Sequence, residues 1–266
     1  MYKRKIAVAL GLAGSLGLLG AGPASAADRG LTQEKQTQQQ RPAMPDSHEE
    51  DDYEGPEVID VKVNPNPVVL HKGETEFEVK ALVYDPAGVE SVEVTFESPN
   101  DYYYFDLDYV KTRSSGVEVW TAILSAYPDT YTDLYTVDVD AYDYDYNATY
   151  ERNAGSFSVK LNTVLSFNAS PEGVDRSGRI TLAGHLDRLS RDNRYVDYTG
   201  KTVYFQFKPE GSSDWTTISK TTTTNSSGDY ARTVGAARGD GTWRAVFKGT
   251  GNYASARSGG DFIDVT

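Results

Sequence analysis

The 266-residue sequence contains no cysteine and only three histidines, three tryptophans and two methionines. Without a thiol the chain cannot form a disulfide, a thiolate metal site or a cysteine nucleophile, so stability outside a cell must come from packed cores. Basic residues are also few, because 26 Lys and Arg stand against 39 Asp and Glu, and the net charge is -13. This charge argues against a nucleic-acid partner.

The amino terminus has the three-part pattern of a secretory signal peptide over residues 1–26. Basic residues occupy positions 3–5, an apolar run follows over 6–19, and small residues at 24–26 offer a cleavage site. The apolar run is shorter than the ~20 residues of a membrane-spanning helix. With no cysteine for lipidation and no apolar tail at the end of the sequence, we expect a secreted, extracellular protein without a membrane anchor.

Residues 27–56 differ from the rest of the sequence in composition. They are rich in glutamine and proline, carry an acidic cluster at 49–54 and contain little that could be buried. Such a segment cannot form a packed core. We predict a disordered acidic, glutamine-rich leader that acts as a solvated stalk.

From Val58 onward the sequence alternates between apolar and polar residues over short runs, with no helical periodicity. The run 92–97 predicts that Val92, Val94 and Phe96 face inward. A similar interpretation of 117–123 places the odd-numbered residues, including Ile123, inward and Trp120 outward. Seven or eight such strands within about 100 residues are typical of a Greek-key β-sandwich.

The charge balance changes near Leu161. Residues 57–160 contain 20 acidic and 7 basic side chains, whereas 161–266 contain 11 and 13. We therefore predict two domains in tandem, an acidic Tyr/Asp-rich domain over 57–160 and a second over 161–266. The junction at 159–162 is too short for a flexible linker, which predicts restricted relative motion.

The segment Asp85–Val94 resembles the B–C segment of bacterial immunoglobulin-like domains, and Leu134–Ala141 is similar to their F strand. Tyr135 is then placed for a tyrosine corner. The turn Asp143–Asn147 occupies the place of the family's Asp-x-x-Gly-Asn turn. Tyr146 replaces the usual glycine there, although a bulky residue resists positive φ.

The second half resembles the immunoglobulin-like modules of secreted actinomycete proteins. The resemblance lies in residues 200–207, Trp215, 225–230 and 241–245. The two resemblances imply an all-β protein with two tandem immunoglobulin-like Greek-key sandwiches. They imply no particular activity, because this fold hosts many unrelated functions.

The sequence offers little catalytic chemistry. His48, His71 and His185 have no recognisable nucleophile motif beside them, and the G-x-S-x-G, H-E-x-x-H and phosphate-loop motifs are absent. Two carboxylates on distant strands could still serve a glycosidase. We predict a protein that is not an enzyme and has no catalytic residues.

Acidic turns suggest a calcium site in the first domain. The B–C and F–G turns of an immunoglobulin-like sandwich emerge at the same end. Asp85, Asp143, Asp145 and Asn147 would then supply oxygen ligands of the kind that calcium requires. The alternative is that Asp85 only caps its own turn.

Tyrosine is concentrated in residues 57–160, which hold 12 of the 19 tyrosines. Exposed rings beside carboxylates predict a binding surface for a carbohydrate or protein at the cell surface. The predicted ligand-binding residues are Tyr102, Tyr104, Asp106, Asp108, Tyr142, Tyr144 and Tyr146. The alternative is a soluble sheet face, since tyrosine favours strands and aspartate discourages edge pairing.

The second domain contains a polar insertion over residues 187–198. Its Arg188, Arg191 and Arg194 could dock on the acidic first domain, but we favour a solvated loop because exposed ion pairs contribute little. Trp215 and Trp243 lie within alternating runs and are predicted to be core residues.

Taken together, these patterns predict a secreted, monomeric, non-catalytic binding or adhesion module that acts at or near a cell surface, with calcium as a potential stabiliser. The alternative is an accessory protein of an extracellular hydrolase, or an enzyme inhibitor that presents the loop Asp143–Asn147.

Overall fold

The computed structural model describes residues 55–266, and every element in this part of the chain is a β-strand. The prediction of an all-β fold is therefore confirmed. The predicted signal peptide and residues 27–54 of the predicted leader lie outside the described residues. Within residues 55–266, no helix is long and apolar enough to cross a membrane.

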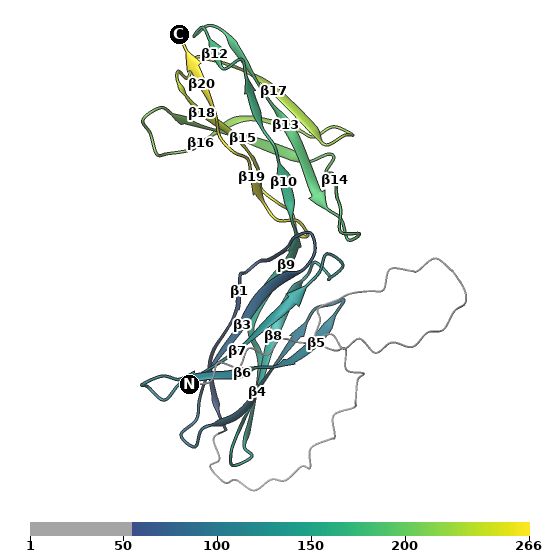
Figure 1. Cartoon of the computed structure of the whole chain (residues 1–266), viewed down its shortest axis with the longest axis vertical. Coiled ribbons are helices and arrows are strands. Elements are labelled where there is room, and N and C mark those ends of the chain that lie inside the picture. Colours follow the sequence, from purple (N-terminus) through teal and green to yellow (C-terminus); the bar gives the residue numbers. More distant parts are fainter. Residues whose placement is uncertain (1–54) are drawn as a thin grey trace, which may run out of the picture.

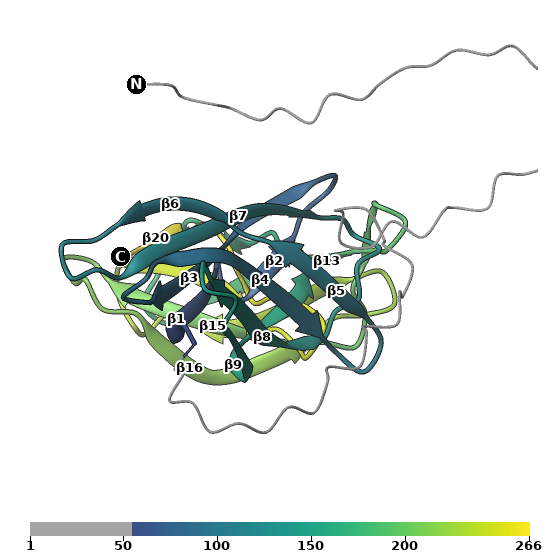
Figure 2. The same cartoon turned by 90° about the horizontal axis from the view of Figure 1, so that it is seen from below.

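The first half of the described chain forms two sheets that pack face to face, which we call the first sandwich (Figure 2). One sheet has the spatial order β1 (Glu57–Asn64), β3 (Thr75–Tyr84), β7 (Glu118–Ala126) and β6 (Asp108–Thr112). The other has the order β2 (Val68–Leu70), β9 (Ala148–Leu161), β8 (Leu134–Asp143), β4 (Val89–Glu97) and β5 (Tyr102–Asp106). This arrangement matches the A-B-E-D and G-F-C sheets of an immunoglobulin-like sandwich.

The core of the first sandwich follows from the alternation in its strands. Val92, Val94 and Phe96 on β4 are at most 1% exposed, as predicted. The Phe96 ring lies 4.8 Å from that of Phe157 on β9, in an edge-to-face arrangement. Aromatic pairs of this kind add stabilisation beyond the burial of their surface.

Strand β7 corrects one prediction. Trp120 is 6% exposed and belongs to the core, whereas Ile123 is 64% exposed, so the predicted positions of these two residues are wrong, although Val119 is buried as predicted. The Trp120 ring packs against Tyr109, and its indole N–H donates to Glu118. Burying the larger indole removes more apolar surface from water than burying the isoleucine would.

The predicted tyrosine corner is confirmed. Tyr135 stands near the start of β8 and is fully buried, and its hydroxyl donates to the backbone carbonyl of Tyr131 at 3.2 Å. The chain is thereby fixed where it enters the central strand of the five-stranded sheet.

The second half of the described chain forms another pair of sheets, the second sandwich (Figure 1). One sheet has the order β10 (Thr163–Leu165), β13 (Arg179–Leu189) and β11 (Asn168–Ser170), with β14 (Tyr195–Asp197) and β17 (Asp229–Gly235) also paired to β13. The other has the order β12 (Gly173–Val174), β20 (Asp261–Val265), β18 (Gly241–Phe247), β15 (Thr202–Pro209) and β16 (Thr216–Thr223), with β19 (Ala256–Arg257) paired to β18.

The two tryptophans of the second sandwich have different environments. Trp243 is 1% exposed and lies in the core, as predicted. Trp215 is only partly buried and lies outside that core, so its predicted core position is wrong. The guanidinium of Arg244 lies 3.8 Å from its ring centroid, and the ammonium of Lys208 lies 5.4 Å away. Cation–π contacts therefore hold Trp215 at the surface.

The two sandwiches meet end to end at a short junction, seen at the middle of Figure 1. Strand β9 ends at Leu161 and β10 begins at Thr163, so Asn162 alone separates them. The Asn162 N–H donates to Leu70 of the first sandwich, and its carbonyl accepts from Leu189 of the second. Leu189 is fully buried in the core cluster of the first sandwich. These contacts agree with the predicted lack of a flexible linker.

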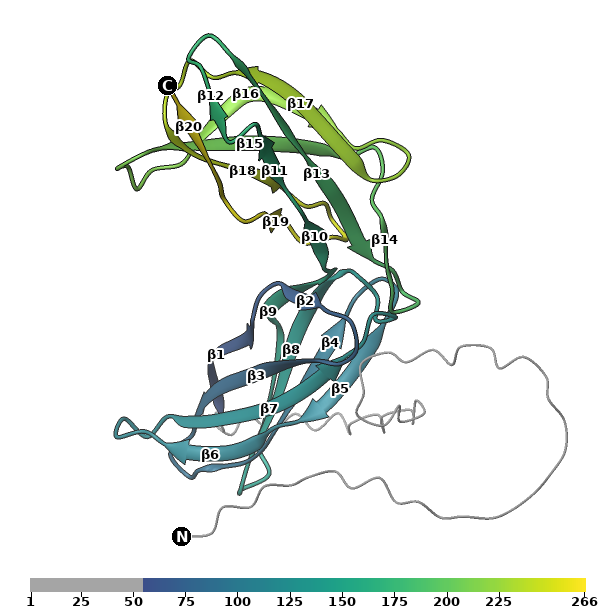
Figure 3. The same cartoon turned by 45° about the horizontal axis from the view of Figure 1, so that its top comes forward.

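The predicted insertion 187–198 is a hairpin made by β13 and β14, and its tip points toward the first sandwich (Figure 3). The Arg191 guanidinium lies 4.5 Å from the Tyr131 ring centroid and donates to the Asp129 carbonyl at 3.2 Å. Residues 191–197 are exposed, as expected of a solvated loop, but Arg191 also contacts the first sandwich. The stacking of Arg191 on the Tyr131 ring, together with its hydrogen bond to the Asp129 carbonyl, contributes more stabilisation than a single surface ion pair would.

Candidate functional site

Strand β5 forms one edge of the five-stranded sheet of the first sandwich and presents tyrosines to solvent. Tyr102 is 52% exposed and Tyr104 is 40% exposed, whereas the alternate residues Tyr103 and Phe105 are buried. This alternation, which the period of two in a β-strand produces, continues as far as the buried Leu107. Asp106 continues the outer row on β5, and Tyr142 lies on the same face two strands away, on β8. We call Tyr102, Tyr104, Asp106 and Tyr142 the tyrosine face.

Acidic residues accompany the tyrosine face because of the strand register. On β4, Glu97 pairs with Tyr102 and Glu93 pairs with Asp106. Both glutamates point to the same side as the residues they oppose. The exposed rings of β5 are therefore flanked by carboxylate oxygens, which accept hydrogen bonds from hydroxyl or ammonium groups of a partner.

Tyr142 is the most enclosed member of the tyrosine face. Its ring meets that of Tyr150 edge to face, with centroids 6.1 Å apart. Burial, a hydrogen bond with Tyr150 and the nearby charges of Glu93 and Asp140 raise the pKa of Tyr142 to about 12. The phenol therefore stays neutral at physiological pH and keeps its O–H donor.

The remaining predicted ligand-binding residues lie elsewhere, at the end of the first sandwich distant from the junction. At Leu107 the chain leaves β5, and Asp108 begins β6 in the opposite sheet. Asp108 and Tyr144 line an open groove of about 480 Å³ together with Tyr109 and Trp120. The structure therefore divides the predicted set among the tyrosine face, this end groove and the exposed Tyr146, which does not line the groove.

The turn Asp143–Asn147 is held by its own hydrogen bonds. One carboxylate oxygen of Asp143 accepts from the backbone N–H groups of Asp145 and Asn147, both at 2.8 Å, and the other accepts from the Asn147 side chain at 2.8 Å. Burial opposes ionisation of Asp143, but these donors outweigh it and lower the pKa of the carboxyl group.

Tyr146 adopts the left-handed conformation of the glycine that it replaces. Its φ is 68°, and its side chain is 88% exposed. Such a backbone is unusual for a bulky residue and persists where surrounding contacts impose it. The hydrogen bonds to Asp143 provide those contacts, so the turn displays a tyrosine at its tip.

The predicted calcium ligands do not form a cluster of carboxylates. Asp143 and Asn147 are in contact, but Asp85 accepts a hydrogen bond from the Ala87 N–H at 2.7 Å and caps its own turn, the alternative noted for it. Within residues 55–266, the groups of three acidic or histidine ligand atoms that lie within 4.8 Å of one another do not include Asp85, Asp143 or Asp145. Calcium binding by this end of the sandwich stays a prediction.

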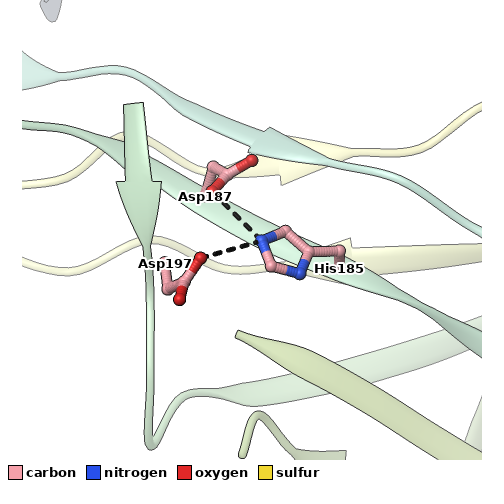
Figure 4. Close-up of side chains that lie close together, drawn as sticks. All are labelled: His185, Asp187 and Asp197. Carbon is pink, nitrogen blue, oxygen red and sulfur yellow. Dashed lines mark hydrogen bonds and ion pairs between the residues drawn. The ribbon is translucent and has the colours of Figure 1, made fainter. Parts of the chain in front are cut away.

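A cluster around His185 in the second sandwich was not predicted (Figure 4). His185 Nε2 lies 3.1 Å from an Asp187 oxygen and 3.4 Å from an Asp197 oxygen, while Nδ1 lies 2.8 Å from an Asp229 oxygen. The hydrogen bond with Asp229 raises the pKa of His185, burial opposes this, and Asp187 adds to the rise.

Strand register brings the His185 cluster together. His185 and Asp187 are two residues apart on β13 and share a face. Asp187 pairs with Asp197 on β14, and His185 pairs with Asp229 on β17. From the sequence alone, only the i, i+2 spacing of His185 and Asp187 indicates this cluster, because Asp197 and Asp229 join it through strand pairing.

Comparisons with known proteins give weak structural similarity. No family model matches the chain, and no curated protein matches it. Among solved structures, Escherichia coli alpha-2-macroglobulin matches at 9% identity over 77% of this chain and 14% of that one, with a TM-score of 0.36. The Yersinia pseudotuberculosis adhesin InvE matches at 16% identity over 78% of this chain and 58% of that one, with a TM-score of 0.29.

The ectodomain of mouse nectin-like molecule 4 matches at 13% identity over 79% of this chain and 65% of that one, with a TM-score of 0.27. The chain thus spans less than two thirds of the length of each of these three proteins. The immunoglobulin-like architecture follows from the strand order of the chain itself.

Proposed function

We propose that this protein is a secreted, non-catalytic binding module that attaches to a carbohydrate at or near a cell surface through the tyrosine face. The observation that carries this proposal is the pair Tyr102 and Tyr104, both exposed on the same side of edge strand β5. Secretion rests on the signal-peptide pattern of residues 1–26.

The chemistry of the tyrosine face suits a sugar. Residues i and i+2 of a strand lie about 7 Å apart along it, so the two rings offer adjacent apolar platforms. Each ring combines an apolar face with a hydroxyl group, and a tyrosine side chain loses little conformational entropy on binding. Asp106 and Glu97 supply acceptors beside the rings, where sugar hydroxyl groups can donate.

A binding assay tests the proposal. The double variant Tyr102→Ser/Tyr104→Ser should lose binding to an insoluble polysaccharide or cell-wall fraction by at least tenfold, while its circular-dichroism spectrum and melting temperature stay close to those of the wild type. Tyr195→Ser serves as the matched control, because Tyr195 is also a partly exposed strand tyrosine but lies on the second sandwich.

The end groove provides the opposing test. If Tyr109→Ser/Tyr144→Ser abolishes binding while the β5 double variant retains it, the tyrosine face is not the contact surface. If carbohydrate fractions fail to bind and a surface protein binds through the same two β5 tyrosines, the partner class is protein and the proposed carbohydrate is wrong.

The turn Asp143–Asn147 favours a second candidate function, the presentation of a rigid loop to an enzyme. Its hydrogen bonds fix an exposed Tyr146 in a strained backbone conformation. Tyr146→Gly should relieve the strain and raise the melting temperature while removing inhibition of a susceptible secreted hydrolase. Unchanged inhibition by Tyr146→Gly, or no inhibition by the wild type across a hydrolase panel, would exclude this candidate.

A further inference from the structure

We propose that His185, Asp187 and Asp197 form a binding site for a zinc ion on the second sandwich. The site is independent of the tyrosine face, because its ligands come from β13 and β14, in the other half of the chain. Figure 4 shows both carboxylates on the same side of the imidazole, with Nε2 directed toward both.

The spacing of the ligand atoms fits a tetrahedral metal ion. Zinc binds nitrogen and carboxylate oxygen at about 2.0–2.2 Å, so neighbouring ligands of a tetrahedral ion lie about 3.3–3.6 Å apart. His185 Nε2 lies 3.1 Å from the Asp187 oxygen and 3.4 Å from the Asp197 oxygen. An ion can therefore take the place of the Nε2 proton with small shifts of two side chains.

The opposite nitrogen of the imidazole supports the same assignment. Nδ1 lies 2.8 Å from an Asp229 oxygen, in position to donate its proton to that carboxylate. A hydrogen bond of this kind holds a metal-binding histidine in the tautomer whose Nε2 lone pair is available, and it raises the basicity of the ring. Asp229 thus acts as a positioning residue for His185.

The turn before β17 makes room for the ring. Gly228 has a φ of 73°, and a Cβ added there would lie 2.9 Å from Cε1 and 3.1 Å from Nε2 of His185. The absence of a side chain at this position leaves space beside Nε2. Exposed fractions of 32% for the Asp187 side chain and 53% for that of Asp197 keep the site open to solvent.

The donor set selects the type of metal. Imidazole suits zinc and other first-row transition metals, whereas calcium prefers six to eight oxygen ligands. Three protein ligands leave a fourth position for water. The ion would join β13 to β14, the two strands of the hairpin whose Arg191 contacts the first sandwich.

Calorimetric titration of the chelator-treated full-length chain with zinc chloride tests the proposal. We expect one zinc ion per chain, with calcium bound at least 100-fold more weakly at this site. His185→Gln should abolish zinc binding, and Asp197→Asn should weaken it at least tenfold. Asp229→Asn should weaken it by about 10–100-fold, the usual effect of losing a carboxylate behind a metal-binding histidine.

Asp192→Asn is the matched control, because Asp192 lies in the same hairpin and its side chain is 76% exposed. It should bind zinc within twofold of the wild type. Asp197 is also exposed, so its variant keeps the test valid if His185→Gln fails to fold. In NMR spectra, zinc should shift the ring resonances of His185 and leave those of His71 unchanged.

Three results would overturn the proposal. They are the absence of zinc binding to the folded wild type, zinc binding that persists in both His185→Gln and Asp197→Asn, and calcium binding at this cluster as tight as zinc binding. A variant that loses zinc binding but keeps carbohydrate binding would show that the zinc site and the tyrosine face act independently.

Discussion

The two sandwiches each bury a hydrophobic core but present different surfaces. The outer face of the five-stranded sheet in the first sandwich carries tyrosines and carboxylates, whereas in the second sandwich cations lie over two partly exposed aromatic rings. Arg244 and Lys208 lie over Trp215, and Lys248 lies over Tyr204 at 4.1 Å. A covered ring is less available to a partner than the half-exposed Tyr102. This difference in ring exposure favours the first sandwich for the proposed carbohydrate contact.

Substitution of Leu189 should have the largest effect on stability, because this residue belongs to the chain of the second sandwich and packs in the core of the first. Leu189→Ala should lower the free energy of unfolding by about 2–5 kcal/mol. Hydrogen exchange should then accelerate in β4 and β8.

Ile180→Ala is the control for Leu189→Ala, since Ile180 is 1% exposed in the core of the second sandwich. It should accelerate exchange in the second sandwich first. If Leu189→Ala affects the second sandwich alone, the shared core at the junction is wrong.

The carboxylate of Asp143 stabilises the turn Asp143–Asn147 in the first sandwich through three hydrogen bonds. Asp143→Asn should cost about 1.5–3 kcal/mol, the usual value for hydrogen bonds to a charged group, with the lower end expected for a turn near solvent. The folded-state pKa is lowered, so the stabilisation is present above the pKa of an unfolded aspartate and is lost as the pH falls through the folded value. Thermal unfolding between pH 2 and pH 6 measures both effects.

The same variant tests the predicted calcium site. Millimolar calcium should raise the melting temperature of the wild type and leave that of Asp143→Asn unchanged, with magnesium as the control for added salt. Equal acid sensitivity in the wild type and Asp143→Asn would contradict the role assigned to Asp143.

Each sandwich contains a buried tyrosine whose hydroxyl donates to a backbone carbonyl. Tyr135 donates to Tyr131 in the first, and Tyr230 donates to Ser166 in the second. Burial raises the pKa of both phenols, so neither should ionise before unfolding in a spectroscopic titration. Tyr135→Phe and Tyr230→Phe should each cost about 1 kcal/mol. A change below experimental error would show that the hydrogen bond contributes nothing.

Arg191 should have the smallest effect. Arg191→Ala removes the contacts with Tyr131 and Asp129, which should cost about 0.5–1 kcal/mol and broaden the distribution of angles between the sandwiches in solution scattering. Arg194→Ala, with a side chain that is 74% exposed, is the control and should change neither quantity. Identical scattering from both variants would contradict the docking role of Arg191.

Prediction from the sequence succeeded where one parity of a strand was clearly apolar. In 92–97 valine and phenylalanine alternate with glutamate and threonine, and the inner face followed directly. In 117–123 both parities contain apolar residues, so the choice between Trp120 and Ile123 depended on packing against the opposite sheet.

The sites were harder to predict than the strands. The exposed parity of β5 follows from period-two alternation, which allowed Tyr102 and Tyr104 to be named. The cluster of His185 with Asp197 and Asp229 depends on the pairing of three strands, and that pairing is long-range information. The conformation of Tyr146 likewise depends on hydrogen bonds to Asp143 that override its intrinsic preference.

Hydrogen–deuterium exchange of the full-length chain, free and bound to a polysaccharide or cell-wall fraction, tests the central claim most directly. Binding through the tyrosine face predicts new protection in residues 93–106 and little change in residues 200–247. Protection confined to the second sandwich, or to the end groove around Trp120, would contradict it.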